Sequence, residues 1–418
     1  MTNFQKKFAT AVATSAMLLN VLAPLAHADT NITITGNGNS SDNKANVTVS
    51  NNTTVSQNNN AIVTNNVSAN SNSGGNNANG NTGGDVTVTT GNATSNTTVS
   101  NDLNKNAANV SNCACNGGNS NVTISGNGQN SDNHATLNTT NNTGVYQNNN
   151  AIVSNNIDSD AKTGGNDANG NTGGSVTVHT GNAKSNVTVD TKANTNVAMV
   201  GGNGGSNGSS LDLLIKDNGK NSDNSIKVND NNGVTVFQDN TAIVTNNVDS
   251  DASTGKNDAN GNTGGDVTVT TGNATSDVNV NNDVNFNAAS VGCDCEMNVG
   301  AKVAGNGENS DNKIGASLNG GVNVFQGGTD KLGNDAILSN NVDSGAKTGK
   351  NDANGNTGDS HMTDPSVTTG SASSTTDVNN SGNTNVYGPD ANFTVPGVNV
   401  NVHLNFDLHD LLSALGLI

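Results

Sequence analysis

The nine residues NDANGNTGG at positions 166–174 decide the fold, because they are almost all turn formers and they recur at a fixed distance. The same string returns at 257–265, and close variants stand at 76–84 (NNANGNTGG) and 351–359 (NDANGNTGD). Asparagine and glycine accept the left-handed backbone that tight corners need. The motif therefore predicts a structural corner that occurs four times.

The repeat extends well beyond this motif. Asp42, Asp132, Asp223 and Asp311 are spaced by 90, 91 and 88 residues, and four glutamines follow with the same spacing. Between these anchors lie runs such as NITIT, NVTVS and DVTVTT, in which apolar and polar residues alternate and β-branched residues dominate. Alternation with a period of two predicts β-strands, and no interior stretch shows a helical period.

These units predict an all-β protein, a β-solenoid (β-helix) of short stacked strands in four repeats of about 90 residues. A string of sandwich domains fits less well, since sandwiches bury bulky side chains and these units offer mainly Val, Ile and Ala. We expect coils of roughly 20 residues, with asparagines hydrogen-bonded between equivalent rungs. The fourth copy has GGTDKLGND where the third has DNT, which predicts a surface loop there.

The first 28 residues have the features of a secretory signal peptide. Lys6 and Lys7 precede an apolar run, and Ala26-His27-Ala28 forms a small-x-small cleavage site. We expect cleavage near Ala28, an extracellular or cell-surface location, and no transmembrane helix, since no later apolar run is long enough. The expected segments are 1–28 (signal peptide), 29–119 (repeat 1), 120–210 (repeat 2, with a Gly-rich end), 211–302 (repeat 3), 303–396 (repeat 4, with insertions) and 397–418 (apolar C-terminal segment).

The charge balance restricts the partners. With 34 acidic and 16 basic residues the chain carries a formal charge of -18 at pH 7. Such a surface repels phosphate backbones, so nucleic acid is not an expected partner. It suits cations, or a basic partner.

Calcium is the cofactor hypothesis that the corner motif raises. Its copies place Asp or Asn oxygens at alternate positions, as a Ca²⁺ loop does. The motif differs from an EF-hand, because glycine is its fourth residue counted from the Asp and no Glu closes the loop. A purely structural corner is the alternative. The candidate ligands are Asp167, Asn169, Asn171, Asp258, Asn260, Asn262, Asp352, Asn354 and Asn356.

Four cysteines form two Cys-x-Cys pairs, Cys113 with Cys115 and Cys293 with Cys295. An exported protein is expected to use them as disulfides. The pairs are 180 residues apart, which in coils of roughly 20 residues is about nine rungs, or near 40 Å. Disulfide Cα atoms lie within about 7 Å. Local Cys-x-Cys bridges, or bridges to another subunit, are therefore favoured.

The C-terminal segment alternates as VNVNVHLNFDL and then turns apolar. One hypothesis is a cap that covers the open edge of the solenoid. The other is an assembly strand that adds to a neighbouring subunit or an anchor protein. The apolar positions are Val398, Val400, Val402, Leu404, Phe406, Leu408, Leu411, Leu412 and Leu415.

No catalytic constellation stands out. The histidines occupy no repeated position, and there is no G-x-S-x-G elbow or glutamate pair. We therefore predict no enzyme. A polysaccharide-acting β-helix enzyme is the alternative, and an ice-binding protein with Thr-x-Thr arrays is a weaker one, because such pairs occur only once or twice per repeat.

The runs VSQNNNAIVTNN (55–66), VYQNNNAIVSNN (145–156) and VFQDNTAIVTNN (236–247) loosely resemble the Gln-x-Gly-x-x-Asn-x-Ala rungs of curlin-type fibre subunits. The chain as a whole is similar in style to the Asn/Gly/Thr/Val-rich repeats of bacterial surface adhesins and filaments. The unit is longer than in curlins and has fewer glutamines. The resemblance implies a structural or adhesive role on the cell surface, with self-assembly or a cell-surface or glycan partner.

Overall fold

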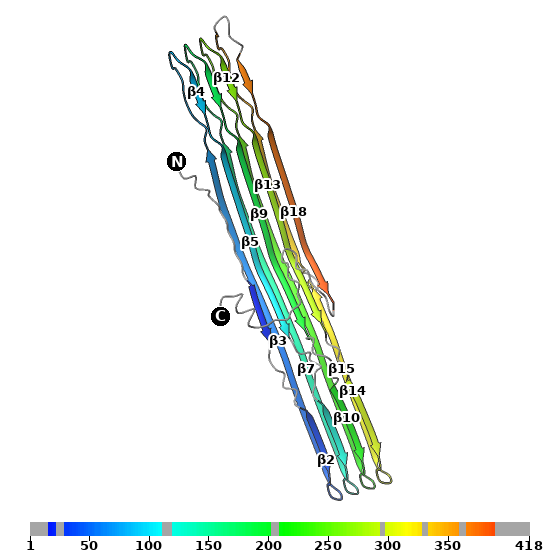
Figure 1. The fold of residues 1–418 in the computed structure, drawn as a ribbon. Helices are drawn as coiled ribbons and strands as arrows, with labels where there is room; N and C mark the ends of the chain where they lie inside the picture. The colour runs from blue at the N-terminus through cyan, green and yellow to red at the C-terminus, as the bar shows by residue number, and fades with distance from the viewer. Residues whose placement is uncertain are drawn as a thin grey trace.

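The computed structural model describes residues 16–21, 29–110, 119–201, 209–292, 297–327, 333–358 and 365–388. The regular elements in these ranges are all β-strands (Figure 1). The chain winds through four turns, and equivalent strands of successive turns pair in parallel without a shift in register. The predicted β-solenoid with four repeats of about 90 residues is confirmed.

Each full turn of the chain is called a rung below. Rung 1 contains β2 (Thr30–Thr35), β3 (Asp42–Asn72), β4 (Val86–Thr89) and β5 (Ala93–Val110). Rung 2 contains β6 (Ser120–Ser125), β7 (Asp132–Lys162), β8 (Val176–His179) and β9 (Ala183–Val200). Rung 3 contains β10 (Ser209–Lys216), β11 (Asp223–Ser253), β12 (Val267–Thr270) and β13 (Ala274–Val291). Rung 4 contains β14 (Met297–Ala304), β15 (Asp311–Gln326), β16 (Asp335–Lys347), β17 (Ser366–Thr368) and β18 (Ala372–Tyr387). One further strand, β1 (Ala16–Val21), pairs with the edge of β5.

The expected coil length of roughly 20 residues is wrong, because one whole repeat makes one rung. The runs NVTVS, TTVSQ and AIVTNN are parts of the single 31-residue strand β3. The asparagines between these runs continue the alternation, and their side chains find partners on the neighbouring rung, so they do not turn the chain. Within the described residues of rung 1, the chain reverses direction at the turn before β3 and at the corner motif.

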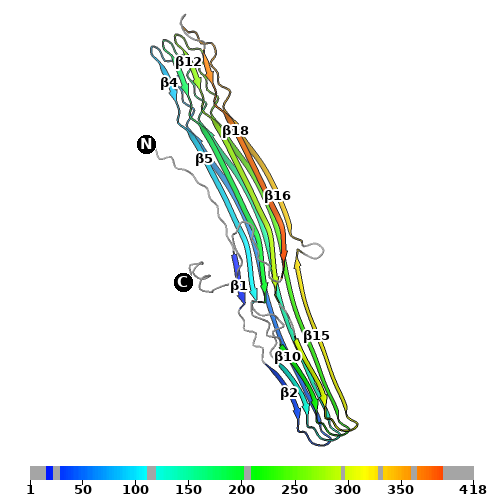
Figure 2. The same cartoon turned by 45° about the vertical axis from the view of Figure 1, so that its right-hand side comes forward.

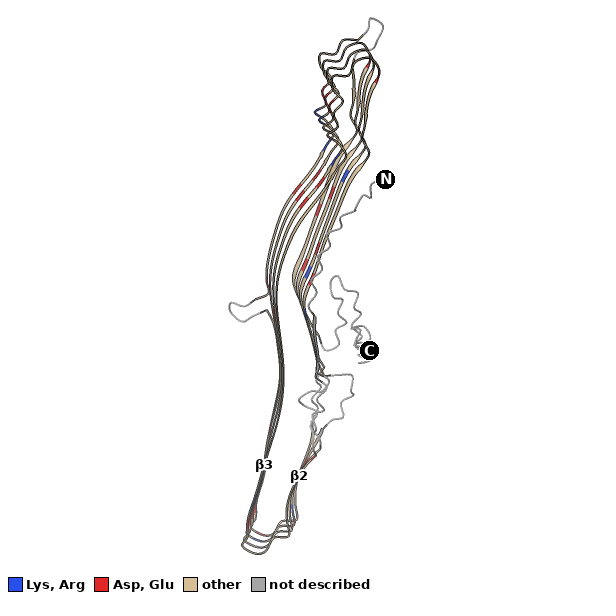
Figure 3. Cartoon of the chain, turned by 90° about the vertical axis from the view of Figure 1, so that its left-hand side faces the viewer, with Lys and Arg blue, Asp and Glu red and all other residues tan. Residues whose placement is uncertain are grey.

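The rungs form a long, narrow, two-layered blade (Figures 1 and 2). One layer is the sheet of long strands β3, β7, β11 and β15, with β16 completing the last rung. The opposite layer contains the β2 sheet and the β5 sheet (Figure 3). At ~3.3 Å per residue, a strand of 31 residues spans about 100 Å. The stack is four rungs thick, with strands ~4.8 Å apart.

The core between the two layers is thin and divided into small apolar clusters. Near one end, Ile34 and Ile124 pack against Leu137 of the long-strand layer. Near the other end, Ala93 and its stacked equivalents pack against Ala161 and Ala252. Polar ladders separate these clusters. The rows of Val, Ile and Ala that the sequence offers therefore form a narrow core.

The insertion in the fourth repeat interrupts a strand without disturbing the register. Strands β15 and β16 pair with successive parts of β11, which is continuous on rung 3. β15 ends at Gln326 and β16 begins at Asp335, and residues 328–332 between them are outside the described ranges. The predicted surface loop falls largely on residues outside the described ranges and stays a prediction.

Candidate functional site: corners and side-chain ladders

The first and sixth residues of the corner motif point into the solenoid and join the rungs. The backbone N–H and the Nδ2 of Asn76 both donate to Asn166 Oδ1, at 3.1 and 2.9 Å. Asn166 donates to Asn257 Oδ1 in the same way, at 3.2 and 2.8 Å. Asn171 and Asn262 repeat this arrangement five residues on. The asparagines of rungs 2 and 3 are buried, whereas Asn76 on the first rung is exposed. Together they serve as pillars of the corner.

The glycines of the corner are required by backbone geometry and by close packing. Gly170 and Gly173 have φ values of 64° and 98°, in the region that favours glycine. Gly164, just before the motif, approaches the next rung so closely that a Cβ would lie 1.7 Å from the carbonyl oxygen of Gly255. The motif therefore specifies the geometry of a stacked corner.

The nine calcium candidates do not converge on a point within one rung. Asp167, Asp258 and Asp352 stack on one another through parallel bridges and are not buried in the core. The Oδ1 atoms of Asn169 and Asn260 each accept a backbone N–H from the next rung, at 2.6 Å. The third set (Asn171, Asn262 and Asn356) belongs to the inward pillars. Calcium stays a prediction, and the aspartate column is the part of the motif that remains available to it.

The stacked aspartates of this column repel one another electrostatically. Partial burial raises the pKa of Asp258, and the like charges of Asp167 and Asp352 on either side raise it further. Rung 1 has Asn77 at this position, so the column of negative charge begins at rung 2. A cation beside the column would offset this repulsion.

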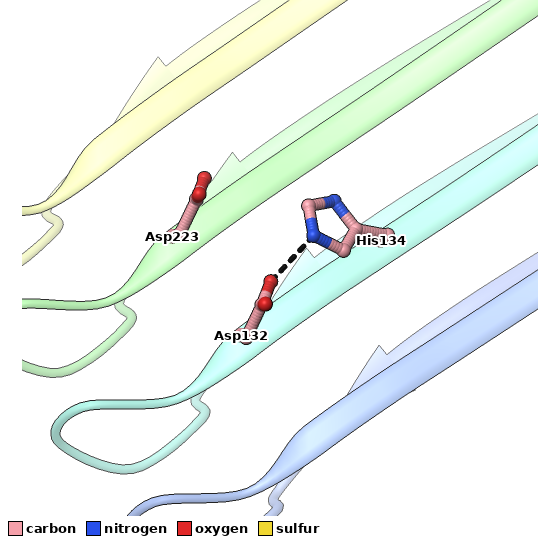
Figure 4. A group of neighbouring side chains, drawn as sticks. All are labelled: Asp132, His134 and Asp223. Atoms are coloured by element: carbon pink, nitrogen blue, oxygen red, sulfur yellow. Dashed lines mark ion pairs between the residues drawn. The ribbon is translucent and has the colours of Figure 1, made fainter.

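Sequence reasoning missed a cluster of Asp132, His134 and Asp223 near the turn before the long strands (Figure 4). Their ligand atoms lie within 4.8 Å of one another, and His134 Nε2 is 2.5 Å from Asp132 Oδ1. The three side chains could supply one imidazole and two carboxylate ligands to a divalent metal. The signal was present in the sequence, since His134 follows the repeated Asp132 by two residues and so shares its strand face.

Ion pairing accounts for this cluster without a metal. Two residues after the repeated aspartate, rungs 1 and 4 carry Lys44 and Lys313, which pair with Asp42 at 3.4 Å and Asp311 at 3.0 Å. His134 occupies the same position on rung 2 and makes the same contact. The histidine thus takes a position that is lysine on rungs 1 and 4 and Ser225 on rung 3. Exposed ion pairs of this kind each contribute little to stability.

A glutamine ladder runs through the middle of the core. Gln147 Nε2 donates to Gln57 Oε1 at 2.7 Å, and Gln238 Nε2 donates to Gln147 Oε1 at 2.8 Å. Gln147 also donates to the carbonyl of Val197 on the opposite layer, at 2.9 Å. Each buried amide therefore links two rungs and both layers.

Asparagines and serines form further columns across the gap between the layers. Asn149 Nδ2 donates to Asn196 Oδ1 across the gap at 2.8 Å and to Asn240 Oδ1 on the next rung at 3.1 Å. A chain of serine hydroxyls zigzags between the layers with oxygen–oxygen distances of 2.8 to 2.9 Å. It runs through Ser95, Ser159, Ser185, Ser250, Ser276, Ser344 and Ser374.

The cysteines and the C-terminal candidates lie outside the described residues. This applies to Cys113, Cys115, Cys293, Cys295 and the nine apolar positions from Val398 to Leu415. The distance argument about the cysteines is nevertheless wrong, because it assumed short coils. Val110 and Val291, the last strand residues before the two pairs, both pair with Val200. They are two strand spacings apart, about 9.5 Å rather than 40 Å.

The fold and these ladders define a β-solenoid repeat protein whose rungs are joined by stacked Asn, Gln and Ser side chains. Comparisons with protein families, with curated proteins and with solved structures give no match. Within the part of the chain that the structure describes, no helix is long and apolar enough to cross a membrane.

Proposed function

We propose that this chain is an exported structural or adhesive protein of the cell surface, a fibre, stalk or surface-layer component without catalytic activity. The observation that carries the proposal is the continuity of the ladders. The glutamine column extends from Gln57 to Gln326, and the corner column from Asn76 to Asn351, without a break. Because interior amides hydrogen-bonded from rung to rung hold the rungs in register, they fix an extended shape.

The outline of the molecule supports a scaffold role. A blade about 100 Å long, built from parallel strands in register, resists bending because many interstrand hydrogen bonds act together. Its acidic surface keeps it soluble outside the cell and suits cations or a basic partner. The resemblance to curlin-type rungs and adhesin repeats points in the same direction.

Cell fractionation tests the proposal directly. The full chain is expressed in an export-competent bacterial host, and its N-terminus is sequenced. We expect removal of the leader near Ala28 and access of added protease or antibody to the protein on intact cells. A chain that keeps its leader and stays inside the cell would contradict the proposed location. Turnover of glycans by the purified chain would contradict the absence of catalysis and would support the polysaccharide-acting alternative.

A further inference from the structure

We infer that the protein assembles head to tail, with rung 4 of one copy stacked on rung 1 of the next in the parallel register that joins its own rungs. The inference rests on the proposed structural role and deepens it, because it names a second copy of this chain as the partner. At one end the stack stops at β2, β3 and β4, and at the other at β14, β15 and β17. Strand edges of this kind are templates for further pairing.

Rung 4 exposes side chains that belong to the core. Val280 is fully buried on rung 3, whereas Val378, its stacked equivalent, is 38% exposed. Val269 is likewise fully buried, and Val367 above it is 44% exposed. These positions are exposed because the stack ends there, so a further rung of the same sequence pattern would cover them.

The corner ladders give the two ends opposite hydrogen-bonding character. A backbone N–H can only donate, and in the Asn76 column each one donates to the Asn Oδ1 of the following rung. The Asn79 column has the opposite direction, because the backbone N–H groups of Asn169 and Asn260 donate to the Asn Oδ1 of the preceding rung. On rung 4 the backbone N–H of Asn351 has no acceptor among the described residues, and on rung 1 Asn76 Oδ1 has no donor among them.

The same difference occurs at Asn356 and Asn81, five residues further along the corner. Rung 4 placed on rung 1 joins donors to acceptors in a column of either direction, whereas two copies of rung 1 would bring acceptors together in the Asn76 and Asn81 columns. The hydrogen bonds therefore favour a head-to-tail contact, which propagates instead of closing as a symmetric dimer.

Glycines at both ends leave room for another rung. A Cβ on Gly255 would lie 1.8 Å from the carbonyl oxygen of Gly349 on rung 4, and a Cβ on Gly349 itself would meet nothing within 4 Å. On the other side, a Cβ on Gly181 would lie 2.6 Å from the carbonyl carbon of Gly91 on rung 1, and Gly91 in turn has open space. Neither end glycine has a positive φ. A side chain at either position fits a single molecule and would block only a neighbouring copy.

Strand β1 lies where the neighbouring copy would bind. It pairs with Lys105–Val110 on the rung 1 edge of the β5 sheet, the edge that β18 of another copy would take in the stack. Residues 16–21 belong to the expected signal peptide. Removal of the leader would therefore open this edge, so the exported and processed chain is the form to test.

The test uses one blocking variant for each end. Gly349→Leu closes the rung 4 face and Gly91→Leu closes the rung 1 face. Gly315→Leu is the control, because Gly315 lies on rung 4 in open space and stacks on Lys227, which shows that the position accepts a long side chain. Circular dichroism and melting temperature establish that each variant is folded. If a leucine variant fails to fold, Gly349→Ala or Gly91→Ala replaces it, since a Cβ alone causes the clash.

We expect the wild-type and Gly315→Leu chains to form filaments with a ~4.8 Å axial spacing and a subunit repeat of about 19 Å, four strand spacings. Each blocking variant alone should sediment as a monomer. An equimolar mixture of the two should form a dimer and stop, because one open face of each kind remains. Non-specific aggregation would not give this result.

Three outcomes would overturn the inference: a wild-type chain that stays monomeric at high concentration, blocked variants that still polymerise, or a mixture that remains monomeric. A processed monomer on the cell surface would reject stacking and leave the proposed surface role intact. If the chain stays inside the cell but the purified protein forms filaments, the stacking is supported and the proposed surface role is rejected.

Discussion

At the scale of single residues, the interior of this protein is unusual in relying on buried amides. Gln147 and Asn149 are fully buried, and each makes its hydrogen bonds to residues on other rungs. A buried amide without partners is costly, so these side chains are tolerated only because the next rung repeats them. The repeat in the sequence predicted such stacking. It did not indicate which asparagines point inward, because that depends on the register of a long strand.

Replacing Gln147 by leucine should destabilise the fold by about 3 kcal/mol, because the substitution leaves a buried N–H of Gln238 and the Oε1 of Gln57 without their partner. The matched control is Gln326→Leu, which removes the last member of the column and has only one ladder neighbour. We expect it to cost about 1 kcal/mol. Urea unfolding of both variants measures the difference, and equal costs would show that the ladder does not act as a column.

Some glycines of successive rungs approach each other too closely for a Cβ to fit between them. A Cβ at Gly164 would lie 1.7 Å from the carbonyl oxygen of Gly255, whereas one at Gly349 would meet nothing. Gly164→Ala should therefore destabilise a monomeric sample by about 3 kcal/mol through displacement of the rung, and Gly349→Ala should change stability by less than about 0.5 kcal/mol. Thermal melting at low protein concentration separates the two. A neutral Gly164→Ala would mean that the rungs are less tightly stacked than the structure shows.

At the scale of elements, the sequence predicted strands and corners correctly but divided the strands too finely. Runs rich in Asn and Gly usually end a strand, yet β7 continues through Asn141 and Asn142 to Lys162. Asn141 is paired with Asn51 and Asn232 on its two neighbours, which satisfies its side chain within the sheet. Single-sequence rules judge a residue by its neighbours along the chain. Here the stabilising partner is about 90 residues away.

The aspartate column at the corner permits a prediction at this scale. The pKa of Asp258 is raised by partial burial and then by Asp167 and Asp352, so its charge opposes stacking at neutral pH. Asp258→Asn should stabilise the protein at pH 7 by about 0.3 kcal/mol, a small value because these side chains are solvated. Asn77 shows that asparagine fits this position. The effect should vanish at pH 3.

Melting with and without a chelator tests whether the aspartate column binds Ca²⁺. If the column binds Ca²⁺, the wild-type melting temperature should fall when a chelator is added, and Asp258→Asn should lose that response. Identical melting curves with and without chelator would leave the motif as a structural corner, whose inward asparagines and positive-φ glycines account for the repeated sequence.

At the scale of the whole molecule, the sequence predicted the class of fold and the number of repeats but not the shape. Four rungs of about 90 residues and eighteen rungs of about 20 residues have the same composition and the same alternation of strands. Among the described residues of rung 1, the chain reverses at the turn around Gly36–Ser41 and at the corner motif, and the distance between these two places sets the length of the rung. The ion pair of His134 was missed for a related reason, since its position is lysine on rungs 1 and 4, which is visible only when the rungs are aligned.

The acidic residues of rung 3 make stability depend on pH in an unusual direction. The pKa values of Asp239, Asp249, Asp258 and Asp283 are all raised above the ordinary value of 3.8, in each case mainly because burial disfavours the charged form. Neighbouring rungs add like charges, such as Asp335 near Asp239 and Asp343 near Asp249. Folding therefore takes up protons in the window above pH 3.8.

The sign of the effect follows from this. A carboxyl whose folded pKa is raised contributes stability that is fully present below its unfolded pKa and is lost as pH rises through the folded value. We expect the melting temperature to rise as the pH is lowered from 7 toward 3.8, with the rise falling in the range just above 3.8 where the raised pKa values lie. The double variant Asp249→Asn/Asp258→Asn should show a smaller rise, because two of the four groups are gone. A wild-type melting temperature that is flat or falls over this window would contradict the raised pKa values of these carboxyls.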